Sequence, residues 1–383
     1  MTSDALKGSI AASISEIGDE LIALSNQLHD DPELGWQEHR SAAAVSAVLA
    51  AHGFAVEPAY LGLETAFRAV RAPRERTRFT VGFLAEYDAL PGLGHACGHN
   101  LISAMSVGGA IALAAVADNL GIAVEVIGTP AEEGGGGKIE LLERGAFTEL
   151  DLALMAHPAP VDVAEARPFA VTHWHVQYDG AAAHAAAYPE RGTNANDAFL
   201  VAQLAIALLR QQLPGSVRVH GVQTRGGEAP NAIPERTEGR WYVRAETTEE
   251  LIALEERVKK CFEAGALASG AKLTITPESK RYAEMRTDEQ ALDWYRSNAL
   301  ALGRNFDADP ADVTMNRAST DMGNVSQLVN AIHPYIGVGG SASNHQAAFA
   351  EACVGEIAEQ TLRDGATALA WTALDAALSR VGT

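Results

Sequence analysis

Short apolar runs alternate with helical patterns between residues 79 and 155, and this alternation limits the chain to few folds. Runs at Phe79–Ala85, Ala123–Gly128 and Leu152–Met155 have the length and composition of buried strands. Helical patterns at Leu101–Ala117 and Ile139–Arg144 separate them. Strands and helices that alternate at these lengths indicate βαβ units. The sequence therefore predicts an α/β fold in which a mixed, largely parallel sheet is flanked by helices.

The pattern changes after about residue 165. The predicted elements there are a strand, a helix, two strands, a helix and a strand, at residues 169–178, 197–212, 217–223, 240–245, 249–268 and 272–276. This order is typical of a ferredoxin-like α+β domain. A chain of 383 residues is long enough for two domains. We therefore expect a discontinuous α/β domain of residues 1–165 and 280–383, with a second domain of residues 166–279 inserted in it.

The charge balance excludes some partners. Lys plus Arg number 29 and Asp plus Glu number 49, so the net charge is 29 − 49 = −20. A surface this acidic repels phosphate backbones and anionic headgroups, so neither a nucleic acid nor a membrane is expected as a partner. The run Leu101–Ala117 is short for a membrane span and is interpreted as a buried helix. Three sparse cysteines and the lack of a secretory signal in the first residues favour the cytoplasm.

Ligand-type side chains follow the first apolar run directly. The loop after Ala85 contains Glu86, Asp88, His95, Cys97 and His99. Open α/β sheets form their sites at the carboxyl ends of strands. Cys97 and His99 are two residues apart, so their side chains can converge on one metal ion, and thiolate and imidazole both suit zinc. The segment therefore predicts a metal site rather than a buried thiol among surface histidines.

The ends of later strands carry the same residue types. Glu132 and Glu133 follow the second run, His157 follows the third, and His345 follows a predicted strand at His333–Val338. Two adjacent carboxylates repel each other, so they need a nearby cation or a raised pKa on one of them. A metal ion would supply the cation, and the carboxylate with the raised pKa could act as a general base. The candidate ligands are Cys97, His99, Glu133, His157 and His345, with Glu132 left over. This set is too large for one tetrahedral zinc and suits two ions.

These motifs resemble those of the M20 metallopeptidase family. Within it they are similar to the amidohydrolase branch, which includes indole-3-acetyl-amino-acid hydrolases, aminobenzoyl-glutamate hydrolase and related dipeptidases. The resemblance spans nearly the whole chain, through His29-x-x-Pro32-Glu33-Leu34 with Glu38, His95-Ala-Cys-Gly-His99, Pro130-Ala-Glu-Glu-Gly-Gly135, His157-Pro158, Gly180-Ala-Ala-Ala-His184, Pro230-Asn-Ala-Ile-Pro234 and His345.

The resemblance implies a di-zinc aminopeptidase-like catalytic domain and an inserted lid domain through which the chain forms a homodimer. It assigns two divalent ions per chain to Cys97, His99, Glu133, His157 and His345. Zinc is expected, with manganese or cobalt as alternatives. Glu132 would be the general base, and Asp88 would orient a metal ligand. On the lid, His184 would stabilise an oxyanion, and Asn231 would line the same substrate pocket.

The chain departs from the family pattern at two points. Asn100 stands where the commoner amidohydrolase motif has Asp, and Glu86-Tyr-Asp88 stands where the general peptidases have His-x-Asp. Whether Cys97 bridges the two ions therefore stays open. The arginine that would bind a substrate carboxylate also stays open among Arg191, Arg225, Arg240, Arg244 and Arg317. The segment Ser319-Thr-Asp321-Met-Gly-Asn324 is interpreted as a helix N-cap, with a place in the substrate pocket as the alternative.

We expect a metal-dependent hydrolase that cleaves the amide bond of an N-acyl or N-aroyl amino acid, or of a dipeptide-like substrate with a free carboxylate. Metal-activated water would attack, with Glu132 as the general base. Hydrolysis of N-carbamoyl amino acids on the same scaffold is an alternative. A non-catalytic ligand-binding protein is a third hypothesis, disfavoured because Glu132 and all five ligand positions carry competent residues.

Overall fold

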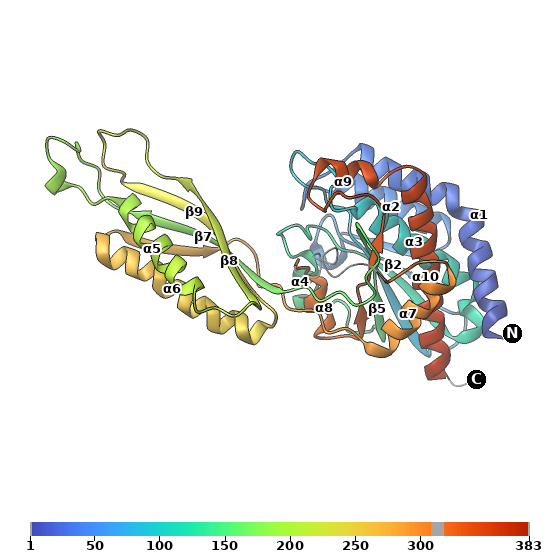
Figure 1. Cartoon of the computed structure of the whole chain (residues 1–383). Coiled ribbons are helices and arrows are strands. Elements are labelled where there is room, and N and C mark those ends of the chain that lie inside the picture. Colours follow the sequence, from blue (N-terminus) through green and yellow to red (C-terminus); the bar gives the residue numbers. More distant parts are fainter. Residues whose placement is uncertain (1, 308–317, 382–383) are drawn as a thin grey trace. The chain divides into compact units, whose positions relative to one another are not determined.

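The computed structural model describes residues 2–307 and 318–381, which form two compact units (Figure 1). The first unit comprises Met1–Arg167 and Met285–Thr383, and the second comprises Pro168–Glu284. The second unit is thus an insertion in the first. It starts at residue 168 against an expected 166, and ends at residue 284 against an expected 279.

The first unit contains a six-stranded sheet with the order β1-β2-β4-β3-β5-β11. The strands are β1 (Ala55–Pro58), β2 (Phe67–Arg71), β3 (Phe79–Ala85), β4 (Ile122–Gly128), β5 (Leu152–Leu154) and β11 (Ala331–Ile332). The β4–β3, β3–β5 and β5–β11 pairs are parallel, whereas β1–β2 and β2–β4 are antiparallel. The predicted mixed, largely parallel sheet is confirmed. The parallel strands place their carboxyl ends, and the loops that follow them, at one edge.

Helices flank this sheet (Figure 1). They are α1 (Ser3–Asp30), α2 (His39–Ala51), α3 (His99–Ala117), α4 (Gly137–Glu143), α7 (Glu289–Ala301), α8 (Met322–Ser326), α9 (Ala347–Ala352) and α10 (Glu356–Val381). Helix α3 packs against α1 and α10, and a Cβ atom on its Gly108 would lie 2.5 Å from Leu21 of α1. The segment His99–Leu120 is long and apolar enough to cross a membrane, but 89% of its most apolar window is buried inside the protein. Its apolar character is therefore explained by its central place in the core.

The strand expected at His333–Val338 is present as the shorter Tyr335–Gly337, but it does not belong to the six-stranded sheet. Strand β11 ends at Ile332, and a new strand, β12 (Tyr335–Gly337), pairs in parallel with β6 (His157–Ala159). Pro334 lies between them and has no N–H to continue the first ladder. Its carbonyl oxygen instead accepts a hydrogen bond from the N–H of His157 at 2.9 Å. The break brings the chain at residue 334 against His157.

The second unit is a four-stranded antiparallel sheet with two helices. Its elements are β7 (Ala170–Asp179), α5 (Ala195–Arg210), β8 (Val217–Arg225), β9 (Arg236–Ala245), α6 (Thr248–Ser269) and β10 (Lys272–Pro277). The strand order β10-β7-β9-β8 and the helix positions match the predicted ferredoxin-like arrangement. Helices α5 and α6 pack on the sheet around Phe199, Trp241 and Phe262. Strand β8 lies at one edge of this sheet.

Candidate metal centre

The loop after β3 brings one histidine into position as a ligand. Asp88 lies in this loop, and His99 is the first residue of α3. The Nδ1–H of His99 donates to the backbone oxygen of Asp88 at 2.8 Å and lies 3.1 Å from its Oδ1. In the neutral ring, donation from Nδ1 leaves the lone pair on Nε2, which is buried and has no hydrogen-bond partner among the described residues. Asp88 therefore orients His99 in a way that suits a metal ligand.

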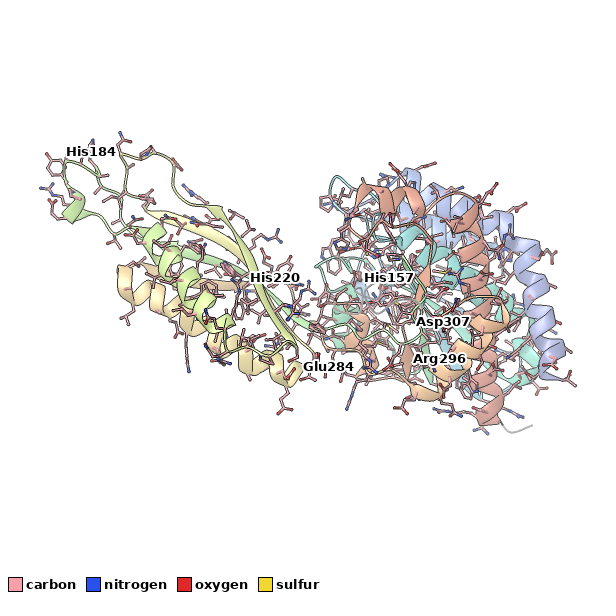
Figure 2. The ribbon with its side chains drawn as sticks, in the orientation of Figure 1. His157, His184, His220, Glu284, Arg296 and Asp307 are labelled. Atoms are coloured by element: carbon pink, nitrogen blue, oxygen red, sulfur yellow. The ribbon has the colours of Figure 1, made fainter. Side chains whose placement is uncertain are left out.

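A second histidine is fixed in the same way. His157 begins β6, and its Nδ1–H donates to the oxygen of Pro158 at 2.8 Å. Its Nε2 lies 3.5 Å from the Sγ of Cys97. The rings of His99 and His157 are 5.9 Å apart and nearly perpendicular, and the side chains of Cys97, His99 and His157 form one group with the spacing of metal ligands. Figure 2 labels His157 in the first unit.

Cys97 also belongs to a second group. The Nε2 of His345 lies 3.6 Å from the Cys97 sulfur and 3.3 Å from the Oε1 of Glu133, and these three residues again have ligand spacing. His345 has a φ of 68°, a left-handed conformation that is uncommon outside glycine, so its backbone is held in a strained turn. The structure thus brings together all five predicted ligands, Cys97, His99, Glu133, His157 and His345, which we call the ligand cluster. Cys97 is shared between its two groups.

The two neighbouring carboxylates, Glu132 and Glu133, differ in their electrostatics. Burial, then the nearby Glu86 and Glu133, raise the pKa of Glu132 well above its ordinary value. Burial raises the pKa of Glu133 too, but the contact with His345 and the nearby His99 together outweigh burial and lower the pKa of Glu133. The backbone N–H of Glu133 also donates to the Oδ2 of Asp88 at 2.9 Å. One carboxylate is therefore suited to stay ionised as a ligand, and the other to accept a proton.

A buried ion-pair network next to the cluster was not predicted. Lys138, the second residue of α4, is fully buried, and its Nζ donates to Glu86 at 2.5 Å and to Asp321 at 2.6 Å. The other oxygen of Asp321 accepts the backbone N–H of Lys138 at 2.9 Å. Asp321 lies at the N-cap position of α8, as interpreted from the sequence, but its side chain makes no cap bond there and accepts the N–H of Lys138 in α4 instead. No local pattern marks a partner 183 residues away.

One further histidine was overlooked. His333 follows β11, is buried, and its ring lies 5.5 Å from that of His157. Neither ring nitrogen has a hydrogen-bond partner within the described part of the chain. Its position at a strand end was the available signal, but the expected continuous strand concealed it.

His184 and Asn231 lie in the second unit, where Figure 2 labels His184 in a loop. The structure brings these two residues together, because the N–H of Ala185 donates to the oxygen of Asn231 at 2.9 Å. The Nδ1 of His184 accepts from the N–H groups of Ala187 and Ala186 at 3.1 and 3.3 Å. The proton of the neutral ring therefore lies on Nε2, and His184 is exposed, so Nε2 can donate to a ligand.

The four candidate arginines of the second unit all have charged or aromatic partners, and Arg244 lies 5.9 Å from the ring centre of Tyr242. Arg225 pairs with Glu228 at 2.6 Å, and Arg240 pairs with Glu278 at 2.6 Å. Arg191 stacks on Tyr188, in the segment that follows His184, at 4.5 Å from the ring centre. Arg317 lies outside the described residues. Arg191 is thus the candidate nearest in sequence to His184.

Comparison with known protein families identifies the family of this chain. The family described as Peptidase family M20/M25/M40 matches residues 82–372, a range that contains the whole ligand cluster together with Glu132, His184 and Asn231. The chain belongs to this family. As an M20 enzyme it is a metal-dependent hydrolase that acts on amide bonds.

Individual relatives agree with this assignment. The chain is 41% identical over 382 residues to the Xaa-Arg dipeptidase of Mus musculus, covering 97% of this chain and 88% of that protein. It is 28% identical to a component of the p-aminobenzoyl-glutamate hydrolase of Escherichia coli, over 79% of this chain and 68% of the relative. Among solved structures, a dinuclear metal-binding M20 peptidase of Bacillus subtilis superposes with a TM-score of 0.71 at 21% identity, covering 95% of this chain and 99% of that one. The M20 fold is thus shared over almost the whole chain.

Proposed function

We propose that this M20 enzyme is a dipeptidase that removes a carboxy-terminal amino acid with a basic side chain and a free carboxylate. The class of substrate rests on the 41% identity to an Xaa-Arg dipeptidase over 97% of the chain. The acidic net charge of −20 is compatible with a cationic substrate. N-acyl and N-aroyl amino acids are the next class to be tested, because an aminobenzoyl-glutamate hydrolase is also a relative.

The observation that carries the chemistry is the pair Glu132 and Glu133 beside two histidines, His99 and His157, whose Nδ1 atoms are each engaged by a backbone oxygen. The ligand cluster would hold two divalent ions, because its members form two groups with ligand spacing, and zinc would suit a set rich in sulfur and nitrogen. When bound, such ions supply an activated water and polarise the substrate carbonyl. Their fit is supported by the buried Nε2 of His99, which has no hydrogen-bond partner among the described residues.

The chain's own residues then have distinct roles. Glu132 accepts a proton from the attacking water and delivers it to the leaving amine, as its raised pKa favours. Asp88 holds His99 and the backbone of Glu133 in place. His184 would donate from Nε2 to a developing oxyanion, and Asn231 would contact the substrate. These roles of the second unit follow the family resemblance and the protonation state of His184.

Association of two copies through the second unit is part of the proposal. Leu200, Leu204 and Leu208 recur every four residues along α5 and are 66, 61 and 58% exposed. A stripe of exposed leucines of this kind is typical of an interface. The edge strand β8 of the same unit offers unpaired backbone groups.

All three cysteines are free thiols and buried, which is compatible with the proposed cytoplasmic location.

The test combines metal content with a substrate panel. Protein purified without added metal would be analysed for ions per chain, then assayed before and after chelation. The panel would contain dipeptides ending in Arg or Lys, the same peptides with an amidated carboxyl terminus, N-acyl and N-aroyl amino acids, and N-carbamoyl amino acids. We expect two ions per chain, and chelator-sensitive cleavage of the free-acid basic dipeptides.

Other results would count against parts of this proposal. Equal cleavage of amidated peptides would contradict recognition of the free carboxylate. Preference for carbamoyl compounds would replace the dipeptidase assignment by the carbamoylase alternative. Absence of metal from protein supplied with zinc would remove the di-metal mechanism altogether.

A further inference from the structure

Glu86 sits at the junction of the ion-pair network and the ligand cluster. It follows β3 directly and is fully buried. Its Oε1 accepts from the Nζ of Lys138, while its Oε2 has no hydrogen-bond partner within the described residues. Burying an unpartnered carboxylate oxygen is costly, so this atom requires an explanation.

The unpartnered oxygen of Glu86 lies against the unpartnered nitrogen of His99. The distance from Glu86 Oε2 to His99 Nε2 is 3.4 Å, and Glu132 Oε2 lies 4.0 Å from the same nitrogen. A charge-assisted hydrogen bond between a protonated imidazole and a carboxylate would be about 2.7–2.9 Å long. Two ligands held about 2.1 Å from one tetrahedral ion are instead about 3.4 Å apart. The spacing matches a pair of ligands better than an ion pair.

The net charge of the buried side chains around Glu86 also favours a nearby cation. Lys138 carries one positive charge, and Glu86 and Asp321 carry one negative charge each, so the fully buried triad has a net charge of 1 − 2 = −1. The Nδ1 proton of His99 is already used by Asp88. A compensating positive charge must therefore lie on the Nε2 side of His99, and a metal ion between Nε2 and Glu86 would supply it.

We infer that Glu86 is an additional protein ligand for the divalent ion that His99 holds, and that Lys138 is the positioning residue that fixes its carboxylate. This inference rests on the proposed di-metal function. It extends the Cys and His ligands with a hard oxygen ligand that the motif resemblance does not assign. Because carboxylate oxygen suits Mn²⁺ better than thiolate does, Glu86 should matter more for binding of Mn²⁺ than of Zn²⁺.

The experiment measures metal affinity directly. Metal-free wild type and E86Q would be titrated with MnCl2, and free Mn²⁺ would be followed by its electron paramagnetic resonance signal. A parallel titration with ZnCl2 would use a competing chelator. E125Q is the matched control, since Glu125 is also a buried carboxylate of this sheet, paired with Arg68 and away from the cluster. Circular dichroism would check that each variant is folded.

We expect wild type and E125Q to bind two ions alike, and E86Q to bind one of its Mn²⁺ ions at least about tenfold more weakly. The loss for Zn²⁺ should be smaller. If E86Q does not fold, E86D keeps the charge for Lys138 but shortens the side chain, and the same weakening is expected. Two ions bound by E86Q or E86D as tightly as by wild type would overturn this inference alone. A wild type that binds neither metal would overturn the di-metal proposal as well.

Discussion

The carboxylate of Glu38 accepts a hydrogen bond from the backbone N–H of Ala131 at 2.7 Å. Ala131 has a φ of 55°, in the left-handed region that disfavours side chains other than glycine. Glu38 precedes α2, so this bond joins the start of that helix to the residue before Glu132 and Glu133. It gives a physical reason for the Glu38 position in the motif that the sequence shares with its family.

Removing this bond should misplace Glu132 without removing the metal ligands. We expect E38A to lower kcat by about 10- to 100-fold, because small displacements of a catalytic group have effects of that size. KM and the number of bound ions should change little. E33A is the matched control, since Glu33 is also buried and holds the start of α2 through Ser41, without contacting Ala131. An equal loss of kcat in E33A would show that α2 alone matters.

Substitution of the two neighbouring glutamates should distinguish the general base from the metal ligand. In E132Q the amide cannot accept a proton, so kcat should fall by about 10²- to 10⁴-fold while both ions are retained. In E133Q we expect loss of metal affinity, measured as ions per chain after dialysis. Loss of metal in E132Q, with full retention in E133Q, would reverse the two assignments.

The oxyanion role of His184 gives a third prediction. H184A should lower kcat by about 10²- to 10³-fold, as for loss of one oxyanion donor, with the metal content unchanged. H220A serves as the control, because His220 is a histidine of β8 in the same unit. If H184A and H220A have the same kcat as wild type, His184 has no part in the reaction.

Acid should destabilise the second unit through His173. Burial, and then Arg244 and Arg240, lower the pKa of His173 to about 4, against 6.5 for the free side chain. The unfolded chain therefore binds a proton more readily than the folded one. The stabilising contribution of a neutral His173 is complete above pH 6.5 and is lost as the pH falls towards 4. The loss amounts to about 3 kcal/mol at most.

Urea unfolding of chelated wild type and H173F at about pH 7.5 and about pH 4.5, on either side of the free side chain's pKa, would measure this contribution. The ring of His173 lies 4.1 Å from that of Tyr242, so phenylalanine keeps the aromatic contact. We expect H173F to lose less unfolding free energy on acidification than wild type does. H175F, on the same strand, is the control, and an identical pH dependence in wild type and H173F would contradict the expectation.

A single charged substitution can test whether the exposed leucines of α5 form the proposed dimer interface. L204E places a carboxylate at the middle of Leu200, Leu204 and Leu208, where burial against a second copy would be unfavourable. We expect sedimentation equilibrium to show a dimer for wild type and a monomer for L204E. L267E is the control, since Leu267 is 88% exposed on α6 and should tolerate a charge. A monomeric wild type would remove the proposed interface.

Sequence patterns predicted the elements that are defined locally. The apolar run Phe79–Ala85 coincides with β3, and Leu101–Ala117 falls within α3. The strands β1 and β2 were missed because each is short and follows no clear alternation. The break at Pro334 was missed because residues 333–338 look like one apolar run, and the change of sheet depends on pairing with His157.

For the site too, residues marked by local sequence patterns were predicted, and residues defined by contacts between distant segments were not. The five candidate ligands could be predicted because their residue types alone indicate metal chemistry at strand ends. Lys138 was not, because a lysine after four glycines resembles an exposed turn, and only its pairing with Glu86 and Asp321 explains its burial. Physical contacts between distant segments, rather than local composition, define this part of the site.

The insertion of the second unit has a consequence for the order of synthesis. Cys97, His99, Glu133 and His157 leave the ribosome before residues 168–284, whereas Asp321 and His345 leave after them. Strand β11, which completes the sheet beside β5, also comes late. A nascent chain that ends before residue 345 therefore contains every member of only one of the two ligand groups. A chain that ends before residue 321 also lacks Asp321, the partner of Lys138. Both proposed metal sites can therefore be complete only in chains whose translation has passed the whole inserted unit.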